Sequence, residues 1–379
     1  MSYRSRFFEA RCGVRAASLG LLLILGSTLG RAVENDCRRV PLAKPLLWPN
    51  GLVTLDSGGF VIASPISGSL TAFDSDGIEK WHRLGGGPPP SDFESPASIT
   101  KIQNGSSRLL IQDGFHRFFF AGESGVVSRR LDLGRRSGSR PALSFVPPVF
   151  LASGDQIEGL AILSPEDGGP PVAGVFRVAT ESERWEGPLT TIRMDAPEFL
   201  AFTLDARMVA PIAAGVALLV VGASHEVRWV SGGSVRTTPL LVGALDPFPT
   251  NLRPGASAMG GVHQELKRLR LPVGIVSDRS ILFVMVARPD PDSEGRLWAL
   301  YEIDPSSGRA NRELWLPTRA DEIRLAPAAE DWILLEKRVE GVEGTQRASS
   351  VVRIPSEWFH SSNSPLARSP RESAVRCRE

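Results

Sequence analysis

Two ionisable residues four positions apart, Asp113 and Arg117, flank a short segment that contains Gly114. A carboxylate at such a position can accept hydrogen bonds from backbone N–H groups, and an arginine four residues later can brace a neighbouring element. A catalytic carboxylate is usually one member of a cluster of reactive groups. The spacing of Asp113 and Arg117 therefore predicts a structural turn rather than an active site.

Other residues with catalytic potential are scattered along the chain. The five histidines show neither His-x-His nor His-Glu-x-x-His spacing, so no metal site is indicated by sequence: His82, His116, His225, His263 and His360. There is no Gly-x-Ser-x-Gly motif of α/β-hydrolases, although a Ser-His-Asp triad needs no sequence adjacency. We predict no catalytic or cofactor-binding residue, and the pattern favours a non-enzymatic function while leaving catalysis open.

Arginines are densest in one segment, which contains Arg129, Arg130, Arg135, Arg136 and Arg140. This segment is either a patch for an acidic partner or a solvated loop. Residues 1–32 contain five Arg and one Glu, so the remaining chain has a net charge near −3, against +1 for the whole. Such a balance is not that of a nucleic-acid-binding protein.

The first 32 residues have the three parts of a secretory signal peptide. Four arginines precede the apolar run 16–29, and small residues, Gly30 and Ala32, follow it. The run is shorter than the ~20 residues that span a bilayer, although an uncleaved anchor is the alternative. We expect a periplasmic or secreted protein with no stable membrane insertion after cleavage.

Cysteine use fits export. Cys12 lies in the expected signal peptide, and Cys37 and Cys377 remain near the two ends of the mature chain. An even number of cysteines in an oxidising compartment favours a disulfide, and a ring-shaped fold would bring these ends together. Two unpaired thiols in terminal segments are the alternative.

Short apolar runs recur along the chain, beginning near residues 60, 109, 160, 216, 281 and 332. Most are rich in Val, Ile, Leu or Phe, and Gly, Asp, Ser or Pro residues follow them, which indicates strands and turns rather than helices. Several strands per period of about 50 residues are typical of a β-propeller. We therefore predict an all-β, six-bladed propeller with four-stranded antiparallel blades, near 44–84, 97–134, 146–190, 197–231, 271–317 and 321–359.

The propeller is expected to span residues 33–359. Residues 232–270 do not match the blade pattern and are predicted to be one long inter-blade insertion, with a seventh blade as the alternative. Residues 360–379 are rich in Ser, Pro and Arg and are predicted to be a flexible tail.

Part of the chain resembles the six-bladed propellers related to the NHL repeat, which are common among exported bacterial proteins. The resemblance rests on the order and spacing of four segments, Phe73–Gly77, Gly85–Pro96, Gln112–Arg117 and Phe119–Gly125. It covers about two blades and departs from the family at residues 90–92. It implies a propeller fold and says little about activity, because propellers serve many functions.

Two functions fit this fold. The first is a non-catalytic binding or scaffold protein, expected to be a monomer, that recognises a protein, peptide or glycan of the cell envelope through its axial loops. The second is a metal-dependent hydrolase similar to the gluconolactonase-type propellers, which hold one divalent cation in the axial channel. Ca²⁺ would then bind hard oxygen ligands. Candidate carboxylates are Glu158, Glu198 and Asp278, although no family motif supports them.

Overall fold

The computed structural model describes residues 36–86, 93–102, 108–133, 142–152, 155–165, 168–192, 206–213, 215–249, 266–278, 280–293, 295–340, 345–368 and 377–378. Residues 37–379 form one compact unit, and the fold described below is that of this unit. The expected signal peptide, residues 1–32, lies outside the described residues. Within the described part of the chain, no helix has the length and apolar character needed to cross a bilayer.

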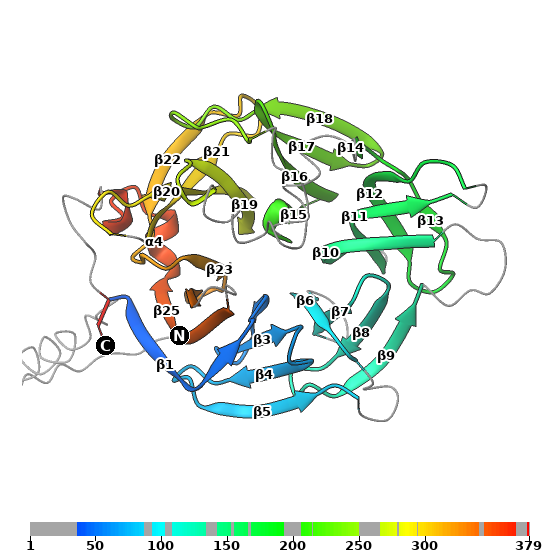
Figure 1. The fold of residues 1–379 in the computed structure, drawn as a ribbon, viewed down its shortest axis with the longest axis horizontal. Coiled ribbons are helices and arrows are strands. Elements are labelled where there is room, and N and C mark those ends of the chain that lie inside the picture. Colours follow the sequence, from blue (N-terminus) through cyan, green and yellow to red (C-terminus); the bar gives the residue numbers. More distant parts are fainter. Residues whose placement is uncertain are drawn as a thin grey trace, which may run out of the picture. The chain divides into compact units, whose positions relative to one another are not determined.

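Six antiparallel sheets are arranged in a ring, which confirms the predicted six-bladed propeller (Figure 1). The described residues form no seventh blade. The strands are β1 (Arg38–Leu47), β2 (Gly51–Thr54), β3 (Phe60–Ser64), β4 (Ser69–Phe73), β5 (Glu79–Leu84), β6 (Pro96–Lys101), β7 (Leu109–Asp113), β8 (Arg117–Ala121), β9 (Val127–Asp132), β10 (Ala142–Ala152), β11 (Gln156–Ser164), β12 (Val172–Ala179), β13 (Trp185–Glu186), β14 (Thr191–Ile192), β15 (Val209–Ile212), β16 (Gly215–Val221), β17 (His225–Ser231), β18 (Ser234–Pro239), β19 (Leu271–Asp278), β20 (Ile281–Pro289), β21 (Arg296–Ile303), β22 (Ala310–Trp315), β23 (Glu322–Ala326), β24 (Asp331–Glu340) and β25 (Thr345–Pro355). The short helices are η1 (Ala206–Met208), α4 (Ser356–His360) and η3 (Pro365–Ala367).

Five blades are built from consecutive strands, beginning with β2, β6, β10, β15 and β19. In blade three, the outer position is shared by β13 and β14, which both pair with β12. Blade six is different, because its outer strand is β1 from the start of the described chain, paired with β25. The prediction that blade one begins near residue 44 was therefore wrong at its start. Residues 44–47 belong to β1, the closing strand of blade six, and blade one begins with β2 at Gly51.

The predicted insertion also differs from the structure at its first residue. Residues 234–239 form β18, the outer strand of blade four, so the connection between blades four and five begins after Pro239 rather than at residue 232. The sequence Ser-Val-Arg-Thr-Thr-Pro has no apolar alternation, because an outer strand of a blade is largely exposed. Residues 250–265 of the predicted insertion lie outside the described residues.

The expected flexible tail is partly packed in the structure. Ser364 and Leu366, beyond residue 360, are buried, and Ser364 accepts a hydrogen bond from the Leu366 N–H at the start of η3. Trp332 stacks on Phe359 of α4, with ring centroids 3.9 Å apart. The apolar face of the last blade thus extends into residues 356–367.

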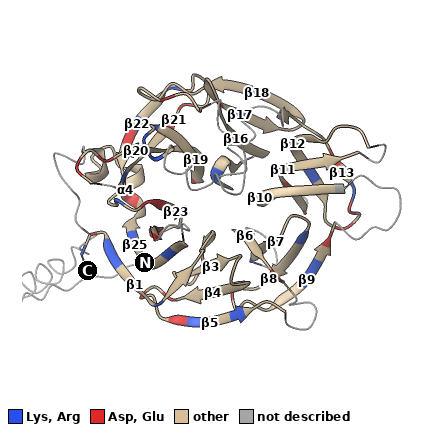
Figure 2. Cartoon of the chain, viewed as in Figure 1, with Lys and Arg blue, Asp and Glu red and all other residues tan. Residues whose placement is uncertain are grey.

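Apolar side chains lie mainly between the blades. In β3, Phe60 and Ile62 pack into the cluster shared with blade six, whereas Val61 and Ala63 pack into the cluster shared with blade two. A strand that is buried on both faces needs a continuous apolar run, which is the pattern seen in the sequence. Figure 2 shows charged residues on outer strands such as β1, β5 and β9, while β3 and β4 have none.

Hydrogen bonds from polar side chains join the innermost strands of neighbouring blades. Arg324 of blade six donates to the carbonyl and side-chain oxygens of Asn50, at 2.8 and 2.6 Å. Asn50 Nδ2 donates to the Ala97 carbonyl of blade two at 2.9 Å. Thr100 Oγ1 donates to the Val149 carbonyl of blade three at 3.0 Å. These contacts fix the relative positions of four blades near the axis.

Candidate functional site

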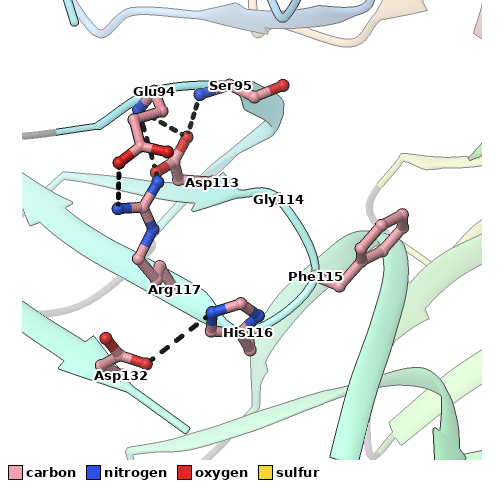
Figure 3. Close-up of a pocket in the computed structure, with 8 residues that line it drawn as sticks. All are labelled: Glu94, Ser95, Asp113, Gly114, Phe115, His116, Arg117 and Asp132. Carbon is pink, nitrogen blue, oxygen red and sulfur yellow. Dashed lines mark hydrogen bonds and ion pairs between the residues drawn. The ribbon is translucent and has the colours of Figure 1, made fainter. Parts of the chain in front are cut away.

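One end of the strands carries both the connections between blades and the turns between the second and third strand of each blade; we call it the connection face. Antiparallel strands reverse direction at each turn, so these two kinds of segment share one end. On this face, a pocket of about 290 Å³ lies beside blade two (Figure 3). Its lining comes from Glu94 and Ser95 in a connection, the turn 113–117, and Asp132 at the end of β9.

Asp113 is fully buried and holds the connection that precedes its own blade. Its carboxylate accepts hydrogen bonds from the backbone N–H groups of Glu94, at 3.0 and 3.1 Å, and of Ser95. It also forms an ion pair with Arg117, whose guanidinium reaches the Glu94 carboxylate at 3.2 Å. Gly114 supports the turn with a φ of 60°, a conformation that glycine adopts without strain. Asp113 and Arg117 thus hold the connection before blade two against the turn 113–117.

The same turn is hydrogen-bonded on its other side to blade three and to Leu133, the residue after β9 of its own blade. The Phe145 N–H donates to the Phe115 carbonyl at 2.7 Å, and the Leu133 N–H donates to the His116 carbonyl at 2.9 Å. Gln112 Nε2 donates to the Phe145 carbonyl at 3.0 Å. The backbone of the turn is therefore fixed from both directions, which makes it a rigid support for its side chains.

Two side chains at the tip of this turn are accessible. Phe115 is 59% exposed, and the His116 side chain is 45% exposed, with Nε2 4.0 Å from Asp132 Oδ1. In Figure 3, Arg117 lies between the carboxylates of Glu94 and Asp113, His116 points toward Asp132, and Phe115 lies on the other side of the turn. Charged groups therefore line the pocket, and the exposed Phe115 ring lies across the turn from them.

Two further large apolar side chains are exposed on the connection face of blade one. Ile66 is 68% exposed in the turn between β3 and β4, and Leu84 is 64% exposed at the end of β5. The backbones of these two segments are joined by a hydrogen bond from the Gly85 N–H to the Gly68 carbonyl, at 2.7 Å. We call Ile66, Leu84 and Phe115 the apolar rim. Sequence reasoning missed it, although an isoleucine between turn residues was a usable signal.

The arginine segment is only partly described. Arg129 stacks on Phe120, with its guanidinium carbon 5.2 Å from the ring centroid, and donates to the Thr180 carbonyl of blade three. Arg130 forms an ion pair with Asp132 at 3.2 Å. Both arginines therefore make contacts within the fold. The other three members of the predicted patch, Arg135, Arg136 and Arg140, lie outside the described residues.

The structure joins Cys37 and Cys377 by a disulfide, with Cα atoms 4.7 Å apart. Backbone hydrogen bonds flank it, because Arg39 N–H donates to the Arg378 carbonyl at 2.6 Å and Arg378 N–H donates to the Cys37 carbonyl at 3.0 Å. The disulfide thus links the segment that leads into closing strand β1 to the C-terminal segment.

Both described carboxylates considered for an axial cation are engaged by basic side chains. Glu158 is buried and lies 3.2 Å from Arg177, and burial raises the pKa of Glu158 although the arginine charge opposes this. Asp278 lies 2.9 Å from His360, and Glu198 is outside the described residues. In the parts of the chain that the structure describes, no three His, Cys, Asp or Glu side chains are grouped as metal ligands would be.

Blade six contains a buried charged cluster that the sequence pattern did not indicate. Lys337 is almost fully buried and contacts Glu322 at 2.7 Å and Gln346 at 2.8 Å. Burial and the nearby Arg324 charge lower the pKa of Lys337 to about 8, although Glu322 opposes the shift. Burial would raise the pKa of Glu322, but the charges of Lys337 and Arg324 outweigh it and hold this pKa well below its usual range. The cluster lies at the start of inner strand β23 and links it to β24 and β25.

Comparisons with known proteins show the fold alone. No family model and no curated protein matches the chain. Among solved structures, a member of the DUF4221 family from Bacteroides vulgatus is similar, with 12% identity, 84% of this chain and 96% of that chain covered, and a TM-score of 0.50. A calcium-binding protein, regucalcin, from Agrobacterium tumefaciens has 12% identity, coverages of 88% and 97%, and a TM-score of 0.46. Virginiamycin B lyase from Staphylococcus aureus has 11% identity, coverages of 84% and 99%, and a TM-score of 0.43.

Proposed function

We propose that this chain is an exported, non-catalytic binding propeller that recognises a protein or peptide through the connection face of blades one and two. The observation that carries the proposal is the exposure of the apolar rim on the connection face, which also holds the charged pocket. Three large apolar side chains are each more than half exposed there, on turns and connections held by backbone hydrogen bonds. Exposed apolar groups with polar surroundings are typical of protein-binding sites.

The chemistry of the rim favours a protein partner over a glycan. Glycan sites stack sugar rings on aromatic side chains, whereas two of the three rim residues, Ile66 and Leu84, are aliphatic. The carboxylates of Glu94 and Asp113 both contact the Arg117 guanidinium. These groups hold one another in place and do not form a cluster of nucleophile, base and acid, so the site supports binding better than catalysis. Export is supported by the expected signal peptide and by the disulfide, because disulfides persist in oxidising compartments.

The test is a selection of phage-displayed random peptides on the immobilised protein, expressed from the full-length sequence. We expect peptides enriched on the wild-type protein to lose binding to a variant with Ile66→Ser, Leu84→Ser and Phe115→Ser. Enrichment that is independent of these three residues would contradict the proposal, as would the absence of any enriched peptide.

A matched control uses three exposed apolar residues at the opposite ends of the strands. Ile78 and Val126 lie in turns between the third and fourth strands of their blades, and Val235 is the second residue of β18, directly after such a turn; they are 59%, 59% and 40% exposed. Their replacement by serine removes a comparable set of apolar side chains while leaving the rim intact. Peptide binding should persist in this control variant.

A further inference from the structure

The connection that follows blade four is hydrogen-bonded to the turn between β16 and β17, on the connection face. The Phe248 N–H donates to the Gly222 carbonyl of that turn at 2.9 Å, and the Leu240 N–H donates to the His225 carbonyl at 2.8 Å. Leu240 and Phe248 are buried in the apolar cluster that contains strand β16. Residues 240–248 are therefore packed against blade four.

One histidine side chain fixes this connection from below. His225 is the first residue of β17 and is only 9% exposed, and its Nε2 lies 2.9 Å from the Asp246 carbonyl oxygen. A carbonyl oxygen can only accept a hydrogen bond, so Nε2 carries a proton and is the donor. The Asp246 carboxylate in turn accepts a hydrogen bond from the Arg270 N–H at 2.7 Å. His225 thus links β17, through Asp246, to the residue that precedes β19.

The second ring nitrogen of His225 lacks an acceptor for a further proton. Nδ1 is buried and has no hydrogen-bond partner in the structure. In the neutral ring, Nδ1 is an acceptor without a donor, whereas in the protonated ring it would be a charged N–H without an acceptor. A buried charged donor without a partner is costly, so the packed connection favours the neutral form of His225.

The charged groups around the ring do not reverse this preference. Burial lowers the pKa of His225 below its usual 6.5, and the hydrogen bond and charge of Asp246 oppose this shift without overcoming it. Glu226 is paired with an arginine of its own strand, and the Arg270 guanidinium contacts the connection at the Ala244 carbonyl. The turn between β16 and β17 contains no charged residue.

We propose that His225 is an acid-sensitive contact, which holds the connection between blades four and five at neutral pH and releases residues 240–248 when it is protonated. Opening exposes the ring, whose usual pKa is 6.5, so the open form takes up the proton first as pH falls. The stabilisation of the closed connection is present above about pH 6.5 and is lost below it. Blade two differs, because Asp113 and Arg117 hold its corresponding turn.

Hydrogen–deuterium exchange of the protein expressed from its full-length sequence, corrected for the intrinsic effect of pH on exchange, tests this proposal. We expect opening of residues 240–248 to increase by up to about ten-fold between about pH 7.5 and about pH 5.5, the limit set by a pKa of 6.5 in the open form. His225→Gln should abolish this pH dependence, because the glutamine amide can donate to the Asp246 carbonyl but does not titrate. The matched control, His116→Gln, replaces an exposed histidine of blade two and should respond as the wild-type protein does.

A second measurement requires no variant. Exchange of the histidine C2 hydrogen, followed by mass spectrometry, gives the pKa of His225 in the wild-type protein. We expect a value below 6.5, and a value at or above it would overturn the proposal. Equal protection of residues 240–248 at both pH values would also overturn it, as would a loss of protection in His225→Gln as large as in the wild-type protein.

Discussion

At the scale of single residues, buried aspartates hold the turns of this propeller. Asp113 accepts N–H groups from a connection 18 and 19 residues earlier in the chain. In blade five, Asp290 accepts hydrogen bonds from the Asp292 N–H at 3.1 Å and the Ser293 hydroxyl at 2.7 Å. The sequence predicted a turn at Asp113 because the residues that mark it, Asp113, Gly114 and Arg117, lie within five positions of one another. It could not show that the donors are Glu94 and Ser95, because that contact depends on how two blades pack.

Replacing Asp113 by asparagine should destabilise the protein. The amide retains one acceptor oxygen and places an NH₂ group where backbone donors now point, so we expect a loss of about 1–3 kcal/mol in the free energy of unfolding. Urea unfolding followed by tryptophan fluorescence measures this loss. Asp76→Asn is the control, because Asp76 forms an exposed pair with Arg38, and it should change stability by less than ~0.5 kcal/mol. Equal effects of the two substitutions would contradict the role of Asp113.

The Glu322–Lys337 pair should make stability depend on acid pH. The pKa of Glu322 in the folded protein lies below its usual value of 4.5, so the unfolded chain takes up this proton first as pH falls. The contribution of Glu322 is fully present above about pH 4.5 and is lost as pH decreases below it. Glu322→Gln should be less stable at neutral pH and should lose less stability on acidification. Parallel slopes of unfolding free energy against pH in both proteins would refute this.

At the scale of elements, three turn glycines allow one blade to lie against the next. In the described part of the chain, Gly77, Gly125 and Gly308 occupy turns between third and fourth strands, where an added Cβ would meet the outer strand of the preceding blade. The period of apolar runs predicted most inner strands. It could not predict outer strands such as β1 and β18, because their exposed residues leave no apolar pattern.

A comparison of two glycine substitutions tests these contacts. Gly308 has a φ of 71°, and a Cβ there would collide with the Pro239 carbonyl oxygen, whereas Gly58 has a φ of 81° and no neighbouring atom within 4 Å of such a Cβ. Both alanine variants carry the backbone strain of a positive φ. Gly308→Ala should therefore be less stable than Gly58→Ala by about 1–3 kcal/mol, the usual cost of overpacking. Thermal unfolding measures the difference, and equal melting temperatures would disprove the contact.

At the scale of the whole molecule, the ring is closed by β1 and by the disulfide next to it. Arg39 of β1 forms a bidentate ion pair with Glu336 of blade six, 297 positions later. The cysteines lie 340 positions apart, so their bond restricts the unfolded chain over nearly its whole length. The sequence left the pairing of the cysteines open, because only a closed ring places the two terminal segments together.

Removing the disulfide should lower stability without changing the fold. We expect the double variant Cys37→Ser, Cys377→Ser to lose roughly 2–5 kcal/mol in the free energy of unfolding, as measured for other disulfides. Thermal unfolding with and without a reductant provides the comparison. The reductant should lower the melting temperature of the wild-type protein and leave that of the double variant unchanged. A wild-type protein insensitive to reductant, after full reduction is verified by thiol titration, would argue against this contribution.

The candidate site could be predicted only in part from the sequence. Asp113 and Arg117 were identified by their spacing, whereas the rim combines Ile66 and Leu84 of blade one with Phe115 of blade two. No local pattern marks such a set, because its members share only one face of the folded ring. The pocket charge likewise depends on Glu94 and Asp132, which come from two different segments.

Closure by β1 also sets the order in which the molecule can be completed during synthesis. β1 leaves the ribosome before any other described strand, and its partner β25 leaves last among the strands. The backbone groups of β1 that pair with β25 therefore stay without this partner while the chain that forms the first five blades is synthesised. Contacts between residues so distant in sequence form slowly. A chain interrupted before β25 would leave an open edge on β1, so truncated products of this gene should aggregate or be degraded rather than persist as smaller propellers.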